Sequence, residues 1–189
     1  MIYGQYKNLE DSSWRCLLDY KIDRLPVDLA QIARLARIKL HENKDAIMLI
    51  GNEIGRSFYI EEQWHVVYDD ACIRPRQRVT IAHEFGHIFL GHMMDYDRRI
   101  RNPGAQYTKQ EKAADMFAEH LLAPACVLWA LNARTADEIA ALCNICPVAA
   151  KGRAQDMEAL YQQGMLLSHP LEKQVRDKFA KFIEEKKSV

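Results

Sequence analysis

The pentapeptide HEFGH at residues 83–87 carries the side chains best suited to chemistry in this 189-residue chain. Each helical residue turns by about 100°, so His83 and His87 would lie about 40° apart on one face, one turn from each other. Both imidazoles can then bind one metal ion. Glu84 lies beside them, where a carboxylate can take a proton from a metal-activated water rather than bind the ion. The spacing therefore predicts the chemistry of a zinc peptidase.

The motif alone is modest evidence, because the composition of the chain gives roughly a 2% chance of one HExxH arrangement. Its setting is stronger evidence. The surrounding residues 78–93 (RVTIAHEFGHIFLGHM) are mostly apolar and contain no proline, which predicts a largely buried helix. The alternative interpretation is a pair of core histidines that bond to backbone or carboxylate groups, since buried polar groups need partners.

A catalytic zinc ion usually has three protein ligands and a water, so a third ligand is required. His92 is one candidate, but the metzincin pattern HExxHxxGxxH places its third histidine one position later. On a continuing helix His92 would also point about 180° away from His83. Glu111 is the other candidate, on the first turn of a predicted helix with the sequence EKAADMFAEHLLAP.

Asp115 lies one turn beyond Glu111 and could accept the second ring N–H of a zinc-binding histidine, which would fix its tautomer. This Glu-x-x-x-Asp spacing resembles that of the thermolysin-like gluzincins. The alternative role for Glu111 is a capping box with Thr108, which would use the same carboxylate oxygens.

The elements that must position these groups predict an α+β fold. The first predicted helix covers roughly residues 9–22, and the second follows Pro26, with Asp28 and Gln31 as a capping pair. Four short segments rich in β-branched and aromatic residues come next and predict a small antiparallel sheet of three or four strands. These segments are IKLHE (38–42), AIMLIG (46–51), RSFYIEE (56–62) and WHVVYDD (64–70).

The HEFGH helix and the helix carrying Glu111 follow this sheet, and a helical region ends the chain. We expect residues 1–132 to form the catalytic domain and residues 133–189 to pack on it. Residues 135–160 have a helix-turn-helix outline, but two basic against four acidic residues argue against DNA binding. Cys143 and Cys146 form a lone CxxC, which predicts buried thiols rather than a structural zinc site.

The composition excludes several protein classes. With 49% hydrophobic and 28% charged residues, the chain suits one well-packed domain with an appendage. Lys plus Arg equals Asp plus Glu at 26 each, so no overall field favours nucleic acid or an anionic membrane. We see no signal peptide or membrane span, and the five cysteines suit reduced thiols, so the sequence predicts a cytoplasmic protein. The sequence does not indicate which oligomeric state the protein has.

Four segments together resemble the ImmA/IrrE family of bacterial zinc metallopeptidases, over roughly residues 10–160. They are PVDLAQIARLARIKL, the short sheet, RVTIAHEFGHIFLGH and EKAADMFAEHLLAP. The resemblance implies one zinc ion bound by His83, His87 and Glu111, with Glu84 as general base. It also implies that Asp115 accepts a hydrogen bond from one of the zinc-binding histidines. Many family members have Glu or Gln where this chain has Ala113. This leaves only Glu111 as the acidic residue that the family pattern would use as a ligand.

The family implies site-specific cleavage of a helix-turn-helix repressor or a similar regulator, often in mobile elements or stress responses. An oxyanion donor is expected as well, and Tyr107 is one candidate beside Arg101, His120 and His65. The alternative function is a non-proteolytic module in which the metal stabilises the fold or senses a ligand while the surface captures a transcriptional regulator. Glu84 favours the enzyme, because a structural metal site needs no base.

Overall fold

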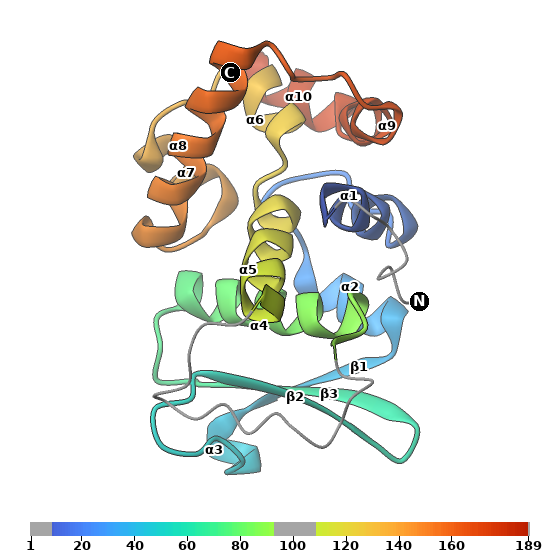
Figure 1. The fold of residues 1–189 in the computed structure, drawn as a ribbon, viewed down its shortest axis with the longest axis vertical. Helices are drawn as coiled ribbons and strands as arrows, with labels where there is room; N and C mark the ends of the chain where they lie inside the picture. The colour runs from blue at the N-terminus through green and yellow to red at the C-terminus, as the bar shows by residue number, and fades with distance from the viewer. Residues whose placement is uncertain (1–8, 93–108, 189) are drawn as a thin grey trace.

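The computed structural model describes residues 9–92 and 109–188, and its elements form the predicted α+β fold (Figure 1). The strands are β1 (Ile38–Glu42), β2 (Gly55–Ile60) and β3 (Gln63–Tyr68). The helices of the described residues are α1 (Leu9–Asp19), α2 (Leu29–Ala36), α3 (Asn43–Ala46), α4 (Arg74–Phe89), α5 (Lys109–Leu122), α6 (Ala125–Ala130), α7 (Ala136–Cys143), α8 (Pro147–Gln163), α9 (Pro170–Lys178) and α10 (Ala180–Lys187).

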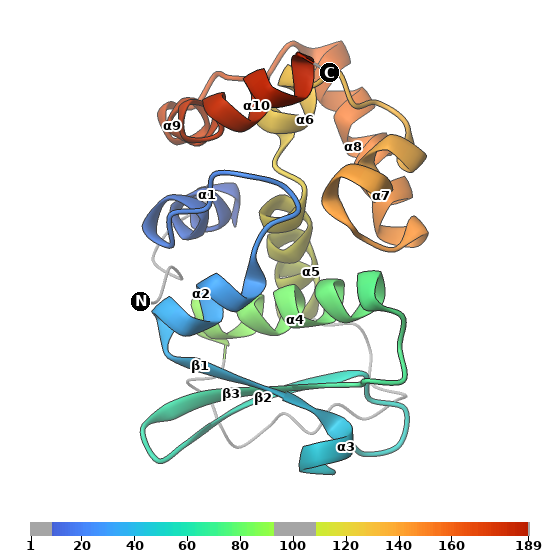
Figure 2. The same ribbon diagram turned by 180° about the vertical axis from the view of Figure 1, so that it is seen from behind.

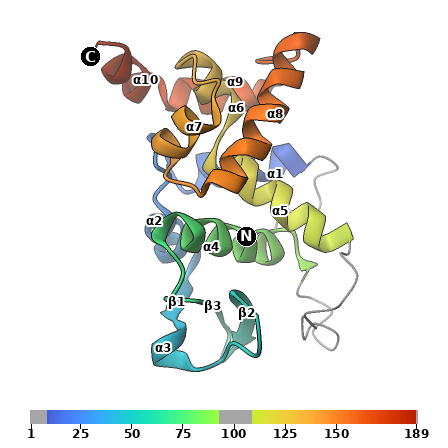
Figure 3. The same cartoon turned by 90° about the vertical axis from the view of Figure 1, so that its left-hand side faces the viewer.

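The sheet, helix α4 and the C-terminal helices lie in successive layers (Figures 1 and 2). α4 runs along one face of the sheet, α5 stands across α4 on its other side, and α6 to α10 gather at the far end of α5. The side view shows the same order (Figure 3). Because α4 is covered from both sides, nearly all of its residues from Thr80 to Phe89 are buried.

The two predicted N-terminal helices are confirmed. The side chain of Asp28 accepts a hydrogen bond from the backbone N–H of Gln31 at 2.9 Å, as expected of an N-cap. The Gln31 side chain does not close a capping box but donates to the backbone oxygen of Tyr20 at 2.8 Å. It thereby ties the start of α2 to the end of α1.

The sheet has three strands, as predicted, but it is mixed rather than antiparallel. β3 lies in the middle, with β2 antiparallel on one side and β1 parallel on the other. β2 and β3 form a hairpin through Glu61 and Glu62, both with positive φ, as a tight type I′ turn requires. β1 and β2 pair with opposite sides of β3, so the chain crosses from one edge to the other between them.

The predicted strand at 46–51 is part of this crossing and is not a strand. Three of its apolar residues, Ile47, Met48 and Ile50, are exposed at the surface, and Ile47 is 84% exposed. The side chain of Asn43 accepts hydrogen bonds from the backbone N–H groups of Met48 and Leu49 at 3.1 and 3.0 Å. These bonds satisfy backbone donors locally, so the segment needs no neighbouring strand.

The C-terminal helices share one continuous core with the rest of the chain. Buried residues such as Ile139 and Met157 belong to the same apolar cluster as Phe85 of α4. Arg78 of α4 donates to the backbone oxygen of Asn144, and Arg153 of α8 donates to that of Ala123. Residues 133–188 therefore pack on the preceding part, while the division of the chain at residue 132 stays a prediction.

The structure also tests two smaller predictions. Cys143 and Cys146 are buried free thiols, and burial raises the pKa of Cys143 to about 12. The helical region predicted at the end of the chain is confirmed as well: α9 and α10 meet at the buried Phe179, and apolar residues of both helices are buried. Among the described helices, none combines the length and apolar character needed to cross a membrane.

Two glycine substitutions should shift stability in opposite directions. A Cβ atom on Gly86 would lie 2.9 Å from the Cα atom of Ala114, where α4 and α5 meet. Gly86→Ala should lower the free energy of unfolding, because overpacking costs about 1–3 kcal/mol and outweighs a helix-propensity gain of at most about 1 kcal/mol. Gly152→Ala on α8 is the matched control, since a Cβ there meets nothing within 4 Å.

Urea unfolding measures both effects. The control should gain about 0.5–1 kcal/mol, since alanine loses less chain entropy in a helix than glycine does. An unfolding midpoint of Gly86→Ala at or above that of the wild type would show that α4 and α5 are not in this contact.

Candidate metal centre

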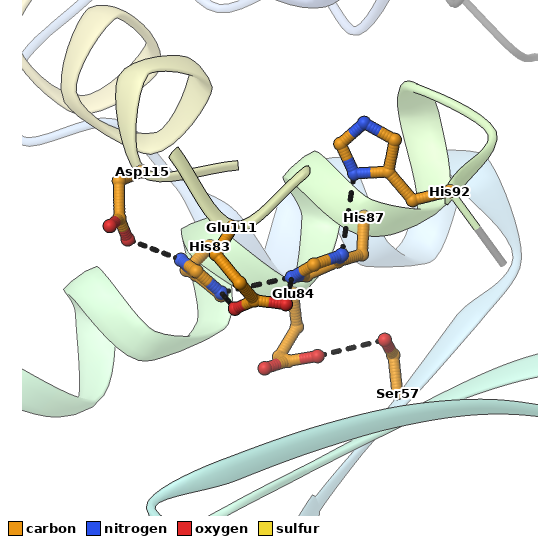
Figure 4. Close-up of polar contacts among 7 residues, drawn as sticks. All are labelled: Ser57, His83, Glu84, His87, His92, Glu111 and Asp115. Atoms are coloured by element: carbon orange, nitrogen blue, oxygen red, sulfur yellow. Dashed lines mark hydrogen bonds and ion pairs between the residues drawn. The ribbon is translucent and has the colours of Figure 1, made fainter. Parts of the chain in front are cut away.

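Helices α4 and α5 bring His83, His87 and Glu111 together (Figure 4). The two histidines lie one turn apart on the same face of α4, as the sequence predicts. Glu111 comes from the first turn of α5, and its carboxylate lies between the two imidazole rings. The close approach of α5 to Gly86, which lies between the histidines, allows this glutamate to reach both.

The spacing of the three donor groups fits a zinc site. The Nε2 atoms of His83 and His87 are 3.0 Å apart, and each lies 3.5 Å from an oxygen of Glu111. A tetrahedral zinc ion with bonds of about 2.0–2.1 Å requires ligand atoms about 3.3 Å apart. All three observed distances lie close to this value. His83 faces Oε2 and His87 faces Oε1 of the Glu111 carboxylate, so the three side chains converge at separations close to those of zinc ligands.

The outward nitrogen of each imidazole is also held. His83 Nδ1 lies 2.5 Å from the carboxylate of Asp115, one turn beyond Glu111. His87 Nδ1 lies 3.3 Å from Nδ1 of His92. Because the Nδ1 atoms are engaged in this way, both Nε2 atoms face the cluster, which is the orientation that metal binding requires.

Glu84 is separate from these three groups. Its side chain turns from α4 towards the sheet, and the residue is only 2% exposed. The hydroxyl of Ser57 on β2 donates a hydrogen bond to Glu84 Oε2 at 2.8 Å. Gly55, on the same strand face, leaves room for this carboxylate, since a Cβ there would meet the side chains of both Thr80 and Glu84.

Ser57 and His92 are the contacts that sequence reasoning missed. No motif marks Ser57, because its role depends on how β2 lies against α4. His92 was considered as a metal ligand and set aside on helix geometry. α4 in fact ends at Phe89, and Gly91 has a positive φ of 74°, so the chain turns before His92. The turn brings His92 behind His87 rather than to the far side of the helix.

Of the four candidates for an oxyanion donor, the two that the structure describes, His120 and His65, do not join the cluster. Tyr107 and Arg101 lie outside the described residues, as does Thr108 of the alternative capping box. His120 is about 180° around α5 from Glu111 and is buried, and burial with the nearby Arg153 lowers its pKa to about 3. His65 stacks on Phe58, on the sheet face opposite to Ser57.

The family comparison agrees with this geometry. Residues 36–154, well over half of the chain, match the M78 peptidase model, described as the IrrE N-terminal-like domain. The chain matches no curated protein and no solved structure. The matched span contains the whole sheet and both helices of the metal cluster. The chain therefore belongs to the IrrE N-terminal-like family of metallopeptidase domains.

Proposed function

We propose that the protein is a zinc-dependent endopeptidase, with His83, His87 and Glu111 as the metal ligands and Glu84 as the general base. The position of Glu84 is the observation that carries the proposal. Its carboxylate is buried beside the three converging donors, and a hydrogen bond from Ser57 orients it. A metal site that only stabilised a fold would have no use for such a group.

The donor set supports zinc in particular. Two imidazole nitrogens and one carboxylate oxygen form the His₂Glu set of zinc hydrolases, and their separations suit bonds of zinc length. Bound zinc would supply Lewis-acid chemistry, which polarises a peptide carbonyl and makes a neighbouring water more acidic. The nearby Asp115 and His92 would hold the imidazoles in position for this ion.

The proton transfers are assigned to Glu84. Its carboxylate takes a proton from the water that attacks the scissile carbonyl carbon, and it then gives that proton to the nitrogen of the leaving amine. The C–N bond breaks, and the water oxygen remains on the new carboxylate. Ser57 keeps the carboxylate aimed during both transfers, so it acts as a positioning residue.

Ser57→Ala should lower kcat/KM about ten- to a hundredfold, because hydrogen bonds to charged groups contribute about 1.5–3 kcal/mol. The effect should fall on kcat, with KM and zinc affinity unchanged, since Ser57 bonds to Glu84, which is not one of the three donors. Ser57→Thr keeps the hydroxyl and is the matched control that should restore most of the rate. An unchanged kcat in Ser57→Ala would remove the assigned role.

The substrate is proposed to be a protein segment in extended conformation. Among the strands that the structure describes, β2 lies at an edge of the sheet and pairs with β3 alone, and it carries Ser57 next to Glu84. An extended peptide could therefore add to this edge as a further strand and present its backbone to the base. The family resemblance supports a helix-turn-helix repressor or a similar regulator as the target. Such a target would place the activity in the cytoplasm.

The proposal is tested by incubating the purified protein with a peptide library and with the repressor-like protein encoded beside it, where one is present. Zinc-loaded protein should produce new N-termini at defined positions, identified by mass spectrometry. Protein treated with a chelator should produce none, and added zinc should restore cleavage. Equal cleavage with and without zinc, or no cleavage of either substrate by zinc-loaded protein, would contradict the proposed function.

A further inference from the structure

A cavity of about 220 Å³ lies directly beside the metal cluster. Its walls come from the face of α4 that precedes His83, from Asp115 of α5 and from Ile54, just before β2. His83 and Glu84 both line it. A peptide that presents its carbonyl to these two residues would place a neighbouring side chain in this cavity.

Arg76 lines the same cavity and is the only Lys or Arg among its described lining residues. It precedes His83 by seven residues, so the two lie on one face of α4, about 10 Å apart along the helix axis. An extended arginine side chain covers much of this distance. The guanidinium of Arg76 can therefore contact the end of a substrate side chain whose residue lies next to the scissile bond.

The three arginines at the start of α4 have different environments. Arg78 donates to the backbone oxygens of Asn144 and Val27, so it holds the fold together. Arg74 is exposed at the first turn of the helix. Arg76 is half-buried in the cavity wall, and its guanidinium has no hydrogen bond or ion pair with any residue in 9–92 or 109–188.

The carboxylates around the cavity have other partners. Asp115 holds His83, Glu84 accepts from Ser57, and Glu111 lies between the two histidines. A half-buried guanidinium in such a place favours an incoming anion, and arginine binds a carboxylate with two parallel hydrogen bonds. The apolar side chains of Ile54 and Val79 in the same walls suit the methylene groups of that residue.

We propose that Arg76 selects substrates with an aspartate or glutamate next to the scissile bond, on the side whose side chain enters this cavity. This inference rests on the proposed function, because it assumes that the peptide is cut at the metal cluster. Arg76 then acts through substrate binding and takes no part in the proton transfers.

The test measures ligand binding rather than turnover. Two short peptidyl hydroxamates, which bind zinc through the hydroxamate, would carry either a carboxylate or its isosteric amide in the side chain aimed at the cavity. Calorimetry with zinc-loaded wild type should show at least about tenfold tighter binding of the carboxylate ligand. Arg76→Gln should remove this preference, and Arg76→Glu should reverse it.

Arg74→Gln is the matched control, since it removes a positive charge from the same helix outside the cavity. Arg74→Gln should keep the wild-type preference for the carboxylate ligand. If it loses this preference as fully as Arg76→Gln does, the charge acts only at long range, and the inference is overturned. Equal binding of both ligands to wild type would also overturn it, with the proposed function intact. If neither hydroxamate binds zinc-loaded protein, the proposed function fails, and the inference fails with it.

Discussion

Glu84→Gln is expected to abolish detectable cleavage and to leave zinc binding unchanged. An amide cannot accept the proton of the attacking water, and loss of a general acid–base group costs about 10²–10⁴ in rate. The substitution keeps the size of the side chain, and Ser57 can still donate to its remaining oxygen. Because Glu84 is not among the three converging donors, the metal should stay in place.

Two measurements check this prediction together. Cleavage rates come from mass spectrometry of a substrate digest, and zinc content comes from elemental analysis of the same sample. Glu158→Gln is the control, because it makes the same chemical change at an exposed site on α8 and should retain wild-type activity. A Glu84→Gln protein that cleaves at the wild-type rate would show that the proton acceptor lies elsewhere.

Zinc should raise the melting temperature of the protein by roughly 8–16 °C at a free concentration a thousandfold above its dissociation constant. Binding to the folded state alone stabilises it by about 4 kcal/mol under these conditions, and each kcal/mol is worth about 2–4 °C at this chain length. The converging Nε2 and carboxylate atoms should be absent as a unit in the unfolded chain, so the metal favours the folded form.

Glu111→Gln should lose most of this zinc-dependent shift, because it replaces the one anionic donor with a weak neutral one. The metal-free variant should melt within a few degrees of the metal-free wild type, since Glu111 is only partly buried, at the start of α5. Differential scanning calorimetry with zinc and with chelator gives both values. A zinc response in Glu111→Gln as large as that of the wild type would exclude Glu111 as a ligand.

Local sequence patterns were enough to predict the parts of the site that lie close together in the chain. The separation of His83 and His87 is fixed by the helical repeat, and the apolar residues around them are enough to predict a buried helix. The Asp28 cap and the apolar faces of α1, α2 and α9 follow from equally local patterns. Glu111 is 24 residues beyond His87, and it became a candidate through its helix and the family pattern together.

Contacts between groups that are far apart in the chain depend on the tertiary fold. Ser57 reaches Glu84 because of the register of β2 against β3 and the contact of that strand with α4. The parallel pairing of β1, the surface course of residues 46–51 and the position of Arg76 in the cavity wall also depend on non-local packing. The position of His92 also depends on where α4 ends, since the turn at Gly91 places it behind His87. Helical periodicity is a property of a few consecutive residues, whereas these contacts depend on which of many competing surfaces is buried.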